Sequence, residues 1–383
     1  MNILFFCGSL ELGRDGVGDY TRRLAGECAA RGHACLVLAL HDCHVPRPSD
    51  LTVDNVRFVR LPAADPWPER IACALQHLQR FAPAAVSWQF VAYGLHPRGF
   101  LPAALLRSAP DLRGPRCHVM LHELWIGLEL GSGWRARAIG WLQRRGVVCL
   151  LDQLDPDCVH TSNPTYQRAL GREGCAAGVL GLFGNVPVES DFSVSTDSLA
   201  RRLPAPPTPD GAAPLVAVTF GTLHPQWSPT ATAAWLRATA LRLGRSPTLV
   251  AIGRGGAHAP AILNQFRQQG VAVVETGDLP GASVSHLLRA ADFGIAPHPW
   301  ALIGKSGAAA AMLEHGLPVL VPRDDWRLRG SPGVARVASD PLLTRLAGLD
   351  EIRTDRWLAT RRAPQSALPR TADSFLAALS LSS

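Results

Sequence analysis

The chain has 383 residues, 47% of them hydrophobic, so it is long enough for two domains that each bury a core. A net charge of +7 favours anionic ligands, anionic membrane surfaces or nucleic acid as partners. No uncharged apolar run is long enough to span a membrane, and no helix-turn-helix, zinc-finger or basic–aromatic pattern indicates nucleic-acid binding.

The first half of the sequence alternates apolar strands with helices. Residues 2–8 form an apolar run that ends in glycine, and residues 20–32 have the pattern of a helix closed by Gly32. Further strands are expected at residues 33–40, 56–61, 83–90 and 117–121. Continuous apolar strands between helices predict a parallel sheet with both faces covered.

The alternation stops at residues 185–214, which are rich in Pro, Ser and Asp, and then starts afresh. The sequence therefore predicts an α/β fold with two Rossmann-like domains facing a cleft. The expected parts are an N-terminal Rossmann-like domain at 1–190, a linker at 191–213, a C-terminal Rossmann-like domain at 214–365, and a C-terminal helix at 366–383 that returns to the N-terminal domain.

Cysteine use and the N-terminus favour a cytoplasmic protein. Nine cysteines occur without a C-x-x-C pair, which is typical of reduced thiols, and residues 1–16 have the pattern of a first strand rather than a signal peptide. The tetrapeptide HDCH at 41–44 contains metal-ligand residue types, but without a second cluster it indicates a polar loop after a strand. No metal site is expected.

One stretch, GKSGAAAAMLEHGLPVLVP at 304–322, carries the chemistry of the second half. A helix that begins near Lys305, Ser306 and Gly307 presents free N–H groups and a cation, which suit an anion. Glu314 lies near the other end of this helix, roughly 13 Å along its axis. A nucleoside diphosphate has a charged diphosphate and a ribose diol, so the two ends of the helix could hold both. An Ala-rich packing helix is the structural alternative.

The region 286–322 resembles the C-terminal core of family 4 glycosyltransferases, which have the GT-B fold. The family pattern is a glutamate, seven residues, a second glutamate, then Gly-x-Pro and a strand. Glu314, Gly316 and Pro318 match its second half, whereas Ser306 stands at the position of the first glutamate. The sequence is therefore a divergent relative in the part of the motif that lies near the donor sugar.

The N-terminal half is similar to the same family. Gly16 and Gly18 lie in a loop that resembles the first glycine loop, just before a helix that Asp19 is expected to cap. The resemblance implies that His122, at the end of a strand, contacts the donor sugar. Glu123 and Trp125 follow it as acceptor-side candidates.

In the C-terminal half the resemblance implies further donor contacts. Gly221 ends a strand where the family has a glycine-rich loop, and Arg254 is a cation at the end of the next strand. Gly277, Asp278 and Leu279 resemble the loop that reads the nucleobase.

The function that the resemblance implies is transfer of a sugar from a nucleoside diphosphate donor to an unknown acceptor, with retention and without metal or other cofactor. Lys305 and His122 are then the catalytic candidates. The expected location is the cytoplasm, with an anionic inner membrane surface as a further partner. Two alternatives stay open: a GT-B nucleotide-sugar epimerase that uses Glu123 and His122, and a non-catalytic relative that binds a partner.

Overall fold

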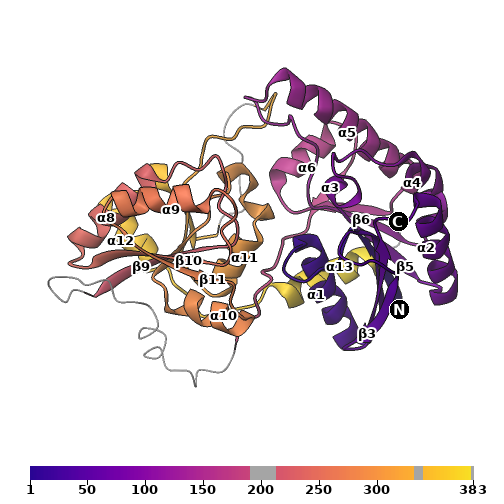
Figure 1. The fold of residues 1–383 in the computed structure, drawn as a ribbon, viewed down its shortest axis with the longest axis horizontal. Helices are drawn as coiled ribbons and strands as arrows, with labels where there is room; N and C mark the ends of the chain where they lie inside the picture. Colours follow the sequence, from indigo (N-terminus) through magenta and orange to yellow (C-terminus); the bar gives the residue numbers. More distant parts are fainter. Residues whose placement is uncertain (190–212, 332–339, 381–383) are drawn as a thin grey trace. The chain divides into compact units, whose positions relative to one another are not determined.

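The structure, a computed structural model, describes residues 1–189, 213–331 and 340–380. The chain forms two compact units: unit 1 comprises Met1–Leu182, Arg327–Arg336 and Leu368–Ser383, and unit 2 comprises Phe183–Trp326 and Val337–Ala367. Each unit is built on a mainly parallel sheet with helices on its faces (Figure 1). The predicted α/β fold with two Rossmann-like domains is confirmed. The linker predicted at 191–213 lies outside the described residues apart from Ala213.

Unit 1 contains an eight-stranded sheet in the order β3-β4-β2-β1-β5-β6-β7-β8. Its strands are β1 (Asn2–Cys7), β2 (Ala34–Asp42), β3 (Ser49–Val53), β4 (Val56–Pro62), β5 (Ala85–Phe90), β6 (Cys117–Leu121), β7 (Cys158–Thr161) and β8 (Ala177–Val179). Its helices are α1 (Gly16–Ala30), α2 (Trp67–Phe81), α3 (Ala92–Leu95), α4 (Ala103–Ser108), η1 (Pro110–Leu112), α5 (Trp134–Leu154), α6 (Pro164–Gly171) and α13 (Leu368–Ser380). All neighbouring strands are parallel except the edge strand β3, which the sequence reading missed.

The last helix, α13, packs on the sheet of unit 1 although it is far from it in sequence. The Phe375 ring stacks on Phe5 of β1 with the ring centroids 5.6 Å apart. Thr371 donates a hydrogen bond to the Gly181 carbonyl, and Asp373 forms an ion pair with Arg31, the C-cap of α1. The chain therefore completes unit 1 only with its C-terminal residues.

Unit 2 contains a six-stranded, fully parallel sheet in the order β11-β10-β9-β12-β13-β14. Its strands are β9 (Pro214–Phe220), β10 (Ser246–Ile252), β11 (Ala272–Gly277), β12 (Phe293–Ile295), β13 (Val319–Val321) and β14 (Leu343–Arg345). Its helices are α8 (Thr230–Arg242), α9 (Ala259–Gln268), α10 (Gly281–Ala290), η2 (Trp300–Lys305), α11 (Gly307–Glu314), η3 (Leu346–Gly348) and α12 (Glu351–Leu358).

The period-2 alternation of the strands builds one hydrophobic cluster on each face of this sheet. Leu215 and Ala217 of β9 belong to the cluster under α8, α9 and α12, whereas Val218 belongs to the cluster under α10 and α11 (Figure 1). Both faces are buried, so polar ligands have access to the ends of the strands rather than to the faces.

Asp42, in the tetrapeptide at 41–44, has a structural role. Asp42 is fully buried at the end of β2, forms an ion pair with Arg60 at 2.7 Å, and accepts hydrogen bonds from the backbone N–H groups of Leu10 and His44. The tetrapeptide thus begins inside the strand and not, as predicted, in a loop after it.

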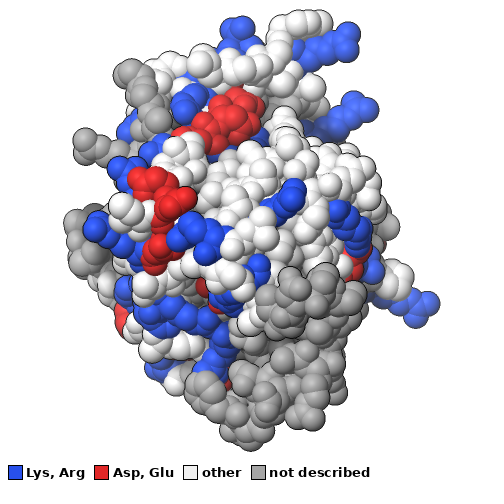
Figure 2. All heavy atoms as spheres, turned by 90° about the vertical axis from the view of Figure 1, so that its left-hand side faces the viewer, with Lys and Arg blue, Asp and Glu red and all other residues white. Residues whose placement is uncertain are grey.

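Surface charges on unit 2 are largely paired. Arg242 pairs with Asp355 at 2.5 Å and Arg267 with Glu275 at 2.6 Å. On the face drawn in Figure 2, arginines and carboxylates are interspersed, so no single-sign field dominates there. Within the described residues no helix combines the length and the apolar character needed to cross a bilayer.

Candidate functional site

The strand order of unit 2 identifies where a ligand can bind. The chain winds outward from β9 through β10 to β11, and then returns to β12 on the other side of β9 and continues to β13 and β14. Loops after β9 and β12 leave the sheet in opposite directions, and this switch point opens a crevice at the carboxyl ends of the strands. The residues that follow β9, β12 and β13 are therefore the candidate ligand contacts.

A buried arginine connects these loops. The Arg323 side chain, which follows β13, donates to His224 Nδ1 at 2.8 Å and to Gln226 Oε1 at 3.2 Å, both in the loop after β9. It also pairs with Asp325 at 2.7 Å. Because a guanidinium only donates, His224 Nδ1 is an acceptor and its remaining proton lies on Nε2. The loop after β9 is thus held against the end of β13 by a fixed cation.

Two histidines at this point stay neutral beside cations. Burial, together with the nearby charges of Lys305 and Arg323, lowers the pKa of His298 to about 4. Burial and the charges of Arg323 and Lys305 also lower the pKa of His224. The two rings meet edge to face with their centroids 6.3 Å apart. The switch point therefore combines the side chains of Lys305 and Arg323 with two neutral imidazoles, a set suited to an anion with hydroxyl groups beside it.

The helix predicted in the 304–322 stretch is α11, and Ser306 is its N-cap. Ser306 is buried, and its hydroxyl accepts a hydrogen bond from the Ala309 N–H at 3.2 Å. Lys305 ends the preceding η2 turn. A Cβ added at Gly307, the first residue of α11, would meet nothing within 4 Å. The serine at the family's glutamate position thus satisfies one helix N–H group and leaves open space at the next residue.

Glu314, at the other end of α11, is 4% exposed. Its Oε1 accepts a hydrogen bond from the Ala367 N–H at 2.8 Å, and its backbone carbonyl accepts one from Gln365 at 2.7 Å. Glu314 therefore anchors the segment that leads out of unit 2. Its predicted contact with a ribose stays a prediction.

The remaining donor candidates lie at the carboxyl ends of β9, β10 and β11. Gly221 has φ +78°, a conformation that favours glycine, and its N–H donates to the Ile252 carbonyl. Arg254 and Asp278 form an exposed ion pair at 2.9 Å, beside a backbone hydrogen bond between Gly253 and Gly277. Leu279 follows, packed against the core. The structure thus brings these sequence-predicted residues to one edge of one sheet.

In unit 1, the glycine loop meets the first strand closely. A Cβ on Gly18 would lie 2.4 Å from the Ser9 carbonyl oxygen, so the close packing of α1 on the loop after β1 requires glycine there. Asp15, not Asp19 as predicted, caps α1 by accepting from the N–H groups of Val17 and Gly18. Gly16 begins the helix in open space. The N-cap differs from the prediction because Asp19 already lies in the first turn of α1, where its carboxylate accepts a hydrogen bond from the Gly13 N–H.

His122 follows β6 and is buried as one end of a chain of polar side chains. Its Nε2 lies 2.9 Å from Gln89 Oε1, Gln89 Nε2 donates to Ser87 Oγ at 2.8 Å, and Ser87 lies 2.8 Å from His118 Nδ1. Since an amide oxygen only accepts, His122 Nε2 carries the proton. Burial lowers the pKa of His122 to about 3, so it is a neutral imidazole at physiological pH.

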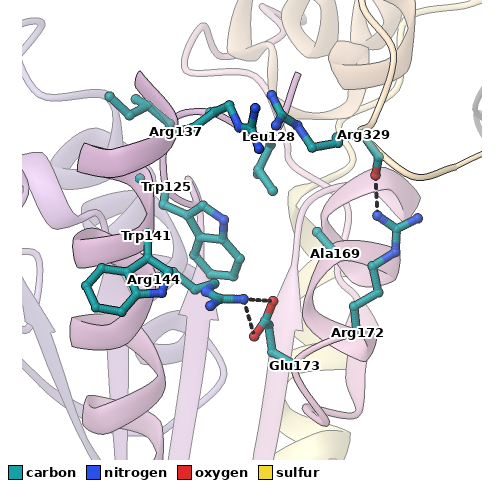
Figure 3. A pocket seen from close by; sticks show the side chains of 12 residues that line it. Trp125, Leu128, Arg137, Trp141, Arg144, Ala169, Arg172, Glu173 and Arg329 are labelled. Carbon is teal, nitrogen blue, oxygen red and sulfur yellow. Dashed lines mark hydrogen bonds and ion pairs between the residues drawn. The ribbon is translucent and has the colours of Figure 1, made fainter. Parts of the chain in front are cut away.

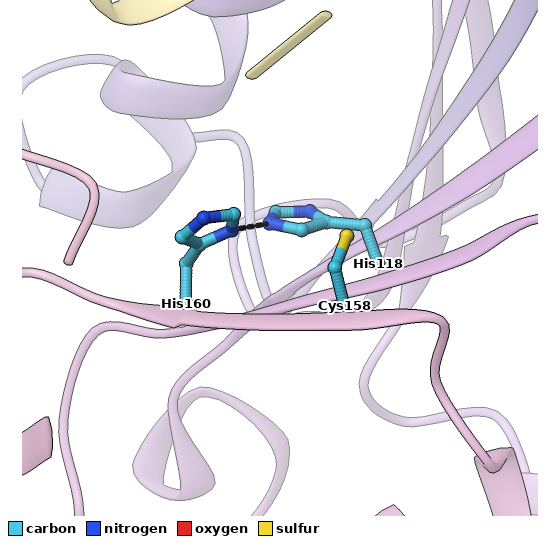
Figure 4. A group of neighbouring side chains, drawn as sticks. All are labelled: His118, Cys158 and His160. Carbon is cyan, nitrogen blue, oxygen red and sulfur yellow. Dashed lines mark hydrogen bonds between the residues drawn. The ribbon is translucent and has the colours of Figure 1, made fainter. Parts of the chain in front are cut away.

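The far end of this chain groups His118, Cys158 and His160, whose ligand atoms all lie within 4.8 Å of one another (Figure 4). Such a nitrogen and sulfur set could hold a transition metal. Here His118 Nε2 and His160 Nδ1 lie 3.1 Å apart and share a hydrogen bond, while burial lowers the pKa of both imidazoles. This hydrogen bond accounts for the close approach of the two imidazoles.

The acceptor-side candidates follow His122 closely. Glu123 is half-buried, and Trp125 is buried in the wall of a pocket of about 260 Å³ that lies wholly within unit 1. Figure 3 shows this pocket between α5, α6 and the segment that carries Arg329.

Part of the chain matches a known protein family. Residues 15–185 match the family model described as "Glycosyl transferase 4-like domain". No curated protein matches the sequence. The resemblance to family 4 glycosyltransferases of the GT-B fold is confirmed.

Solved structures show how far this glycosyltransferase fold extends over the chain. Sucrose-phosphate synthase from Thermosynechococcus elongatus is similar with a TM-score of 0.58 and 15% identity, over 99% of this chain and 94% of that one. Anabaena HepE in complex with UDP and glucose is similar with a TM-score of 0.55 and 15% identity, over 99% of this chain and 95% of that one. A putative UDP-N-acetylglucosamine 2-epimerase from Listeria monocytogenes is similar with a TM-score of 0.53 and 12% identity, over 98% of this chain and 95% of that one. At such identities the likeness establishes the fold alone.

Sequence reasoning missed the residues that organise the switch point of unit 2. His298 and Arg323 each lie within three residues of the end of a short apolar strand, in GIAPHPW and PVLVPRD. Their positions as the first polar side chains after β12 and β13 were the available signal. Ser87 and Gln89 were missed as well, although they are two polar residues at alternate positions of the otherwise apolar strand β5.

Proposed function

We propose that this protein transfers a glycosyl group from a nucleoside diphosphate sugar to an acceptor hydroxyl, with retention at the anomeric carbon and without a bound metal. The bond between the anomeric carbon and the diphosphate oxygen breaks, and a bond to the acceptor oxygen forms on the same face of the sugar. The acceptor proton passes to the departing diphosphate oxygen, so no side chain is needed as a nucleophile.

The observation that carries the donor side is the cationic cluster at the switch point of unit 2. Lys305, the buried Arg323 and the N-terminal amides of α11 provide positive charge where β9 and β12 diverge. Preorganised cations and helix amides stabilise the charge that develops on a departing diphosphate. Gly277, Asp278 and Leu279 are proposed for the nucleobase, and Glu314 for the ribose.

In unit 1 we assign the donor-sugar contact to His122. With Nε2 donating to Gln89, Nδ1 is the acceptor atom of its imidazole, and a neutral acceptor suits a sugar hydroxyl. Glu123 and Trp125 are proposed for the acceptor.

The epimerase alternative requires a base that takes up a proton near neutral pH. Burial holds the pKa of His122 at about 3, which leaves this imidazole a poor proton acceptor there. The non-catalytic alternative rests on Ser306, an N-cap where the family has a carboxylate. Glycosyl transfer gives a role to more of the candidate residues than the epimerase or the non-catalytic alternative does.

Calorimetry with UDP, ADP and GDP, followed by donor-turnover assays, tests the proposal. UDP is the first probe, since HepE was crystallised with UDP and UDP-glucose. We expect one nucleoside diphosphate to bind, and its sugar conjugate to release it in the presence of EDTA when an acceptor is supplied. Diphosphate binding without sugar turnover across acceptor classes would favour the non-catalytic alternative. Interconversion of two nucleotide sugars would favour the epimerase.

A further inference from the structure

The outer face of α5 in unit 1 exposes large apolar side chains. Trp134 is 73% exposed, Trp141 47% and Leu142 50%, and they follow one another at helical spacing along the first turns. Leu130, in the segment just before the helix, is 63% exposed. Tryptophan is usually well buried in a water-soluble fold, so two exposed indoles on one helix indicate a surface that meets an apolar phase.

The same helix is strongly basic. Arg135, Arg137, Arg144 and Arg145 fall within residues 134–151, which contain no Asp or Glu. The Arg135 guanidinium lies 5.4 Å from the Trp134 ring centroid. The Arg145 guanidinium lies 4.9 Å from that of Trp141. Indoles interleaved with arginines are the side chains that settle at the boundary between lipid head groups and acyl chains.

A pocket of about 260 Å³ opens beside this face, and Trp141 belongs to both. Four arginines, Arg137, Arg144, Arg172 and Arg329, line the pocket with a single carboxylate, Glu173 (Figure 3). The indole of Trp125 and the side chain of Leu128 supply an apolar wall. The pocket is too small for a whole lipid and is suited to an anionic head group with the start of its chain.

Two of the pocket cations have donor capacity left for a ligand. Arg144 is paired with Glu173 at 2.9 Å, and Arg172 donates to the Arg329 carbonyl and to Ser331. Arg329 donates through Nη2 to the Glu129 and Ser132 carbonyls, but its buried Nε has no hydrogen-bond partner among the described residues. The Arg137 guanidinium likewise has no hydrogen bond or ion pair to any residue in the described part of the chain.

We propose that the outer face of α5 docks on an anionic phospholipid bilayer and that the adjacent pocket binds the phosphate head group of one lipid. A second copy of this chain is a poor occupant, because a two-fold contact would place the arginines of one α5 against those of the other. The docking does not depend on glycosyl transfer. Identifying the bound lipid phosphate as the acceptor rests on the proposed function.

Vesicle flotation with the full chain tests the docking. We expect the protein to float with phosphatidylcholine vesicles that contain phosphatidylglycerol and not with pure phosphatidylcholine. Replacing Trp134 and Leu142 by Ser should lower the bound fraction about tenfold, because two side chains that would enter the interface are lost. The matched control replaces Leu241 and Ile352 by Ser, which are 64% and 66% exposed on unit 2, and should bind as wild type.

Calorimetry with a short-chain phosphatidic acid below its micelle concentration tests the pocket. We expect this lipid to bind at least about tenfold more tightly than inorganic phosphate, and Arg137→Gln to remove most of that affinity. Equal affinity for phosphate and lipid would overturn the head-group assignment. Failure to float with anionic vesicles while UDP binding persists would overturn the docking and leave the proposed function standing. Self-association lost on Trp134→Ser would assign the face to a second copy instead.

Discussion

The two units carry side chains of different charge at the carboxyl ends of their strands. In unit 1, the strand ends at β5 and β6 carry a buried chain of neutral side chains from His122 through Gln89 to Ser87. In unit 2, the strand ends at β12 and β13 lead to two basic side chains, Lys305 and Arg323. One fold architecture therefore carries neutral polar side chains in one unit and cationic side chains in the other.

The two units differ in how the loss of hydration of their buried polar side chains is compensated. A buried imidazole stays neutral because ionisation would cost its hydration, and its hydrogen bonds then supply direction without charge. Arg323 cannot lose its proton, so its burial needs Asp325 as a counter-ion and further acceptors on His224 and Gln226. The buried imidazole of unit 1 therefore suits a neutral polar group, whereas the cations of unit 2 suit an anion.

Removing His122 should give the largest effect on activity and separate the two sites. His122→Ala takes away a directed contact to the sugar, and we expect turnover to fall about 100-fold, the scale seen for one lost transition-state hydrogen bond. Affinity for the free nucleoside diphosphate should change little, since that ligand has no sugar to contact. Steady-state kinetics and calorimetry on one preparation measure both. A parallel loss of nucleotide affinity would contradict the separation.

Lys305→Ala should damage only the anion site. We expect the nucleoside diphosphate to bind more weakly by about 1.5–3 kcal/mol, the value of a hydrogen bond to a charged group, and the bare nucleoside to bind unchanged. Lys305→Arg should restore part of the loss, because the requirement is a cation of different geometry. Added salt should weaken diphosphate binding more in the wild type than in Lys305→Ala.

The sequence offers a second measurement, because Lys305 is its only lysine. Reductive methylation therefore modifies this side chain and the N-terminus alone. Saturating diphosphate should protect Lys305 and leave the N-terminus reactive, whereas the nucleoside should protect neither. Equal reactivity with and without diphosphate would place the anion elsewhere.

Glu314 tests whether α11 is a ligand-binding helix at both ends or at one. Glu314→Ala leaves the Ala367 N–H without its acceptor, so the free energy of unfolding should fall by about 1–3 kcal/mol. Glu314→Gln keeps an acceptor oxygen and should retain most of the stability, while both nucleoside and diphosphate bind more weakly through the ribose. Thermal unfolding and calorimetry separate the two effects. Normal nucleoside affinity in Glu314→Gln would assign the carboxylate to anchoring residues 365–367.

The two buried imidazoles should make the free energy of unfolding depend on pH in the acidic range. The folded-state pKa of His122 is about 3 and that of His298 about 4, below the ordinary value of 6.5. Between pH 6.5 and these values the unfolded chain binds more protons than the folded protein. The free energy of unfolding therefore decreases as the pH is lowered. The decrease is about 1.4 kcal/mol per pH unit for each histidine once the pH is well below 6.5. His122→Gln should flatten this dependence between pH 6.5 and 5, where most carboxylates stay ionised.

The sequence predicted the larger features because they depend on local pattern. Apolar strands, glycine breaks and the Ala helix at 304–322 all fix their own conformation, so both parallel sheets and α11 were expected. Contacts between distant segments had no such signal. The Glu314 contact to Ala367 and the link from Arg323 to His224 depend on how strands far apart in sequence are ordered in the sheet. Burial of His122 was likewise invisible before its partners in β5 were placed.

The smallest expected effect concerns the exposed pair Arg254–Asp278, and it decides where the anion site ends. Both side chains are more than half exposed, and they already neutralise each other. Asp278→Asn should therefore release Arg254 and tighten diphosphate binding about twofold at low salt, while Arg254→Ala should weaken it about twofold. Arg267→Ala is a matched control, because Arg267 pairs with Glu275 at similar exposure away from the switch point.

These small values follow from screening, since charges in water contribute far less than Lys305 and Arg323 beside buried groups. Calorimetry at two salt concentrations should show the effect of Arg254→Ala vanish when salt is added and that of Lys305→Ala persist in part. If Arg254→Ala instead weakens diphosphate binding as much as Lys305→Ala does, the diphosphate lies at the ends of β10 and β11. The cluster around Arg323 would then be a structural brace between the loops after β9 and β13.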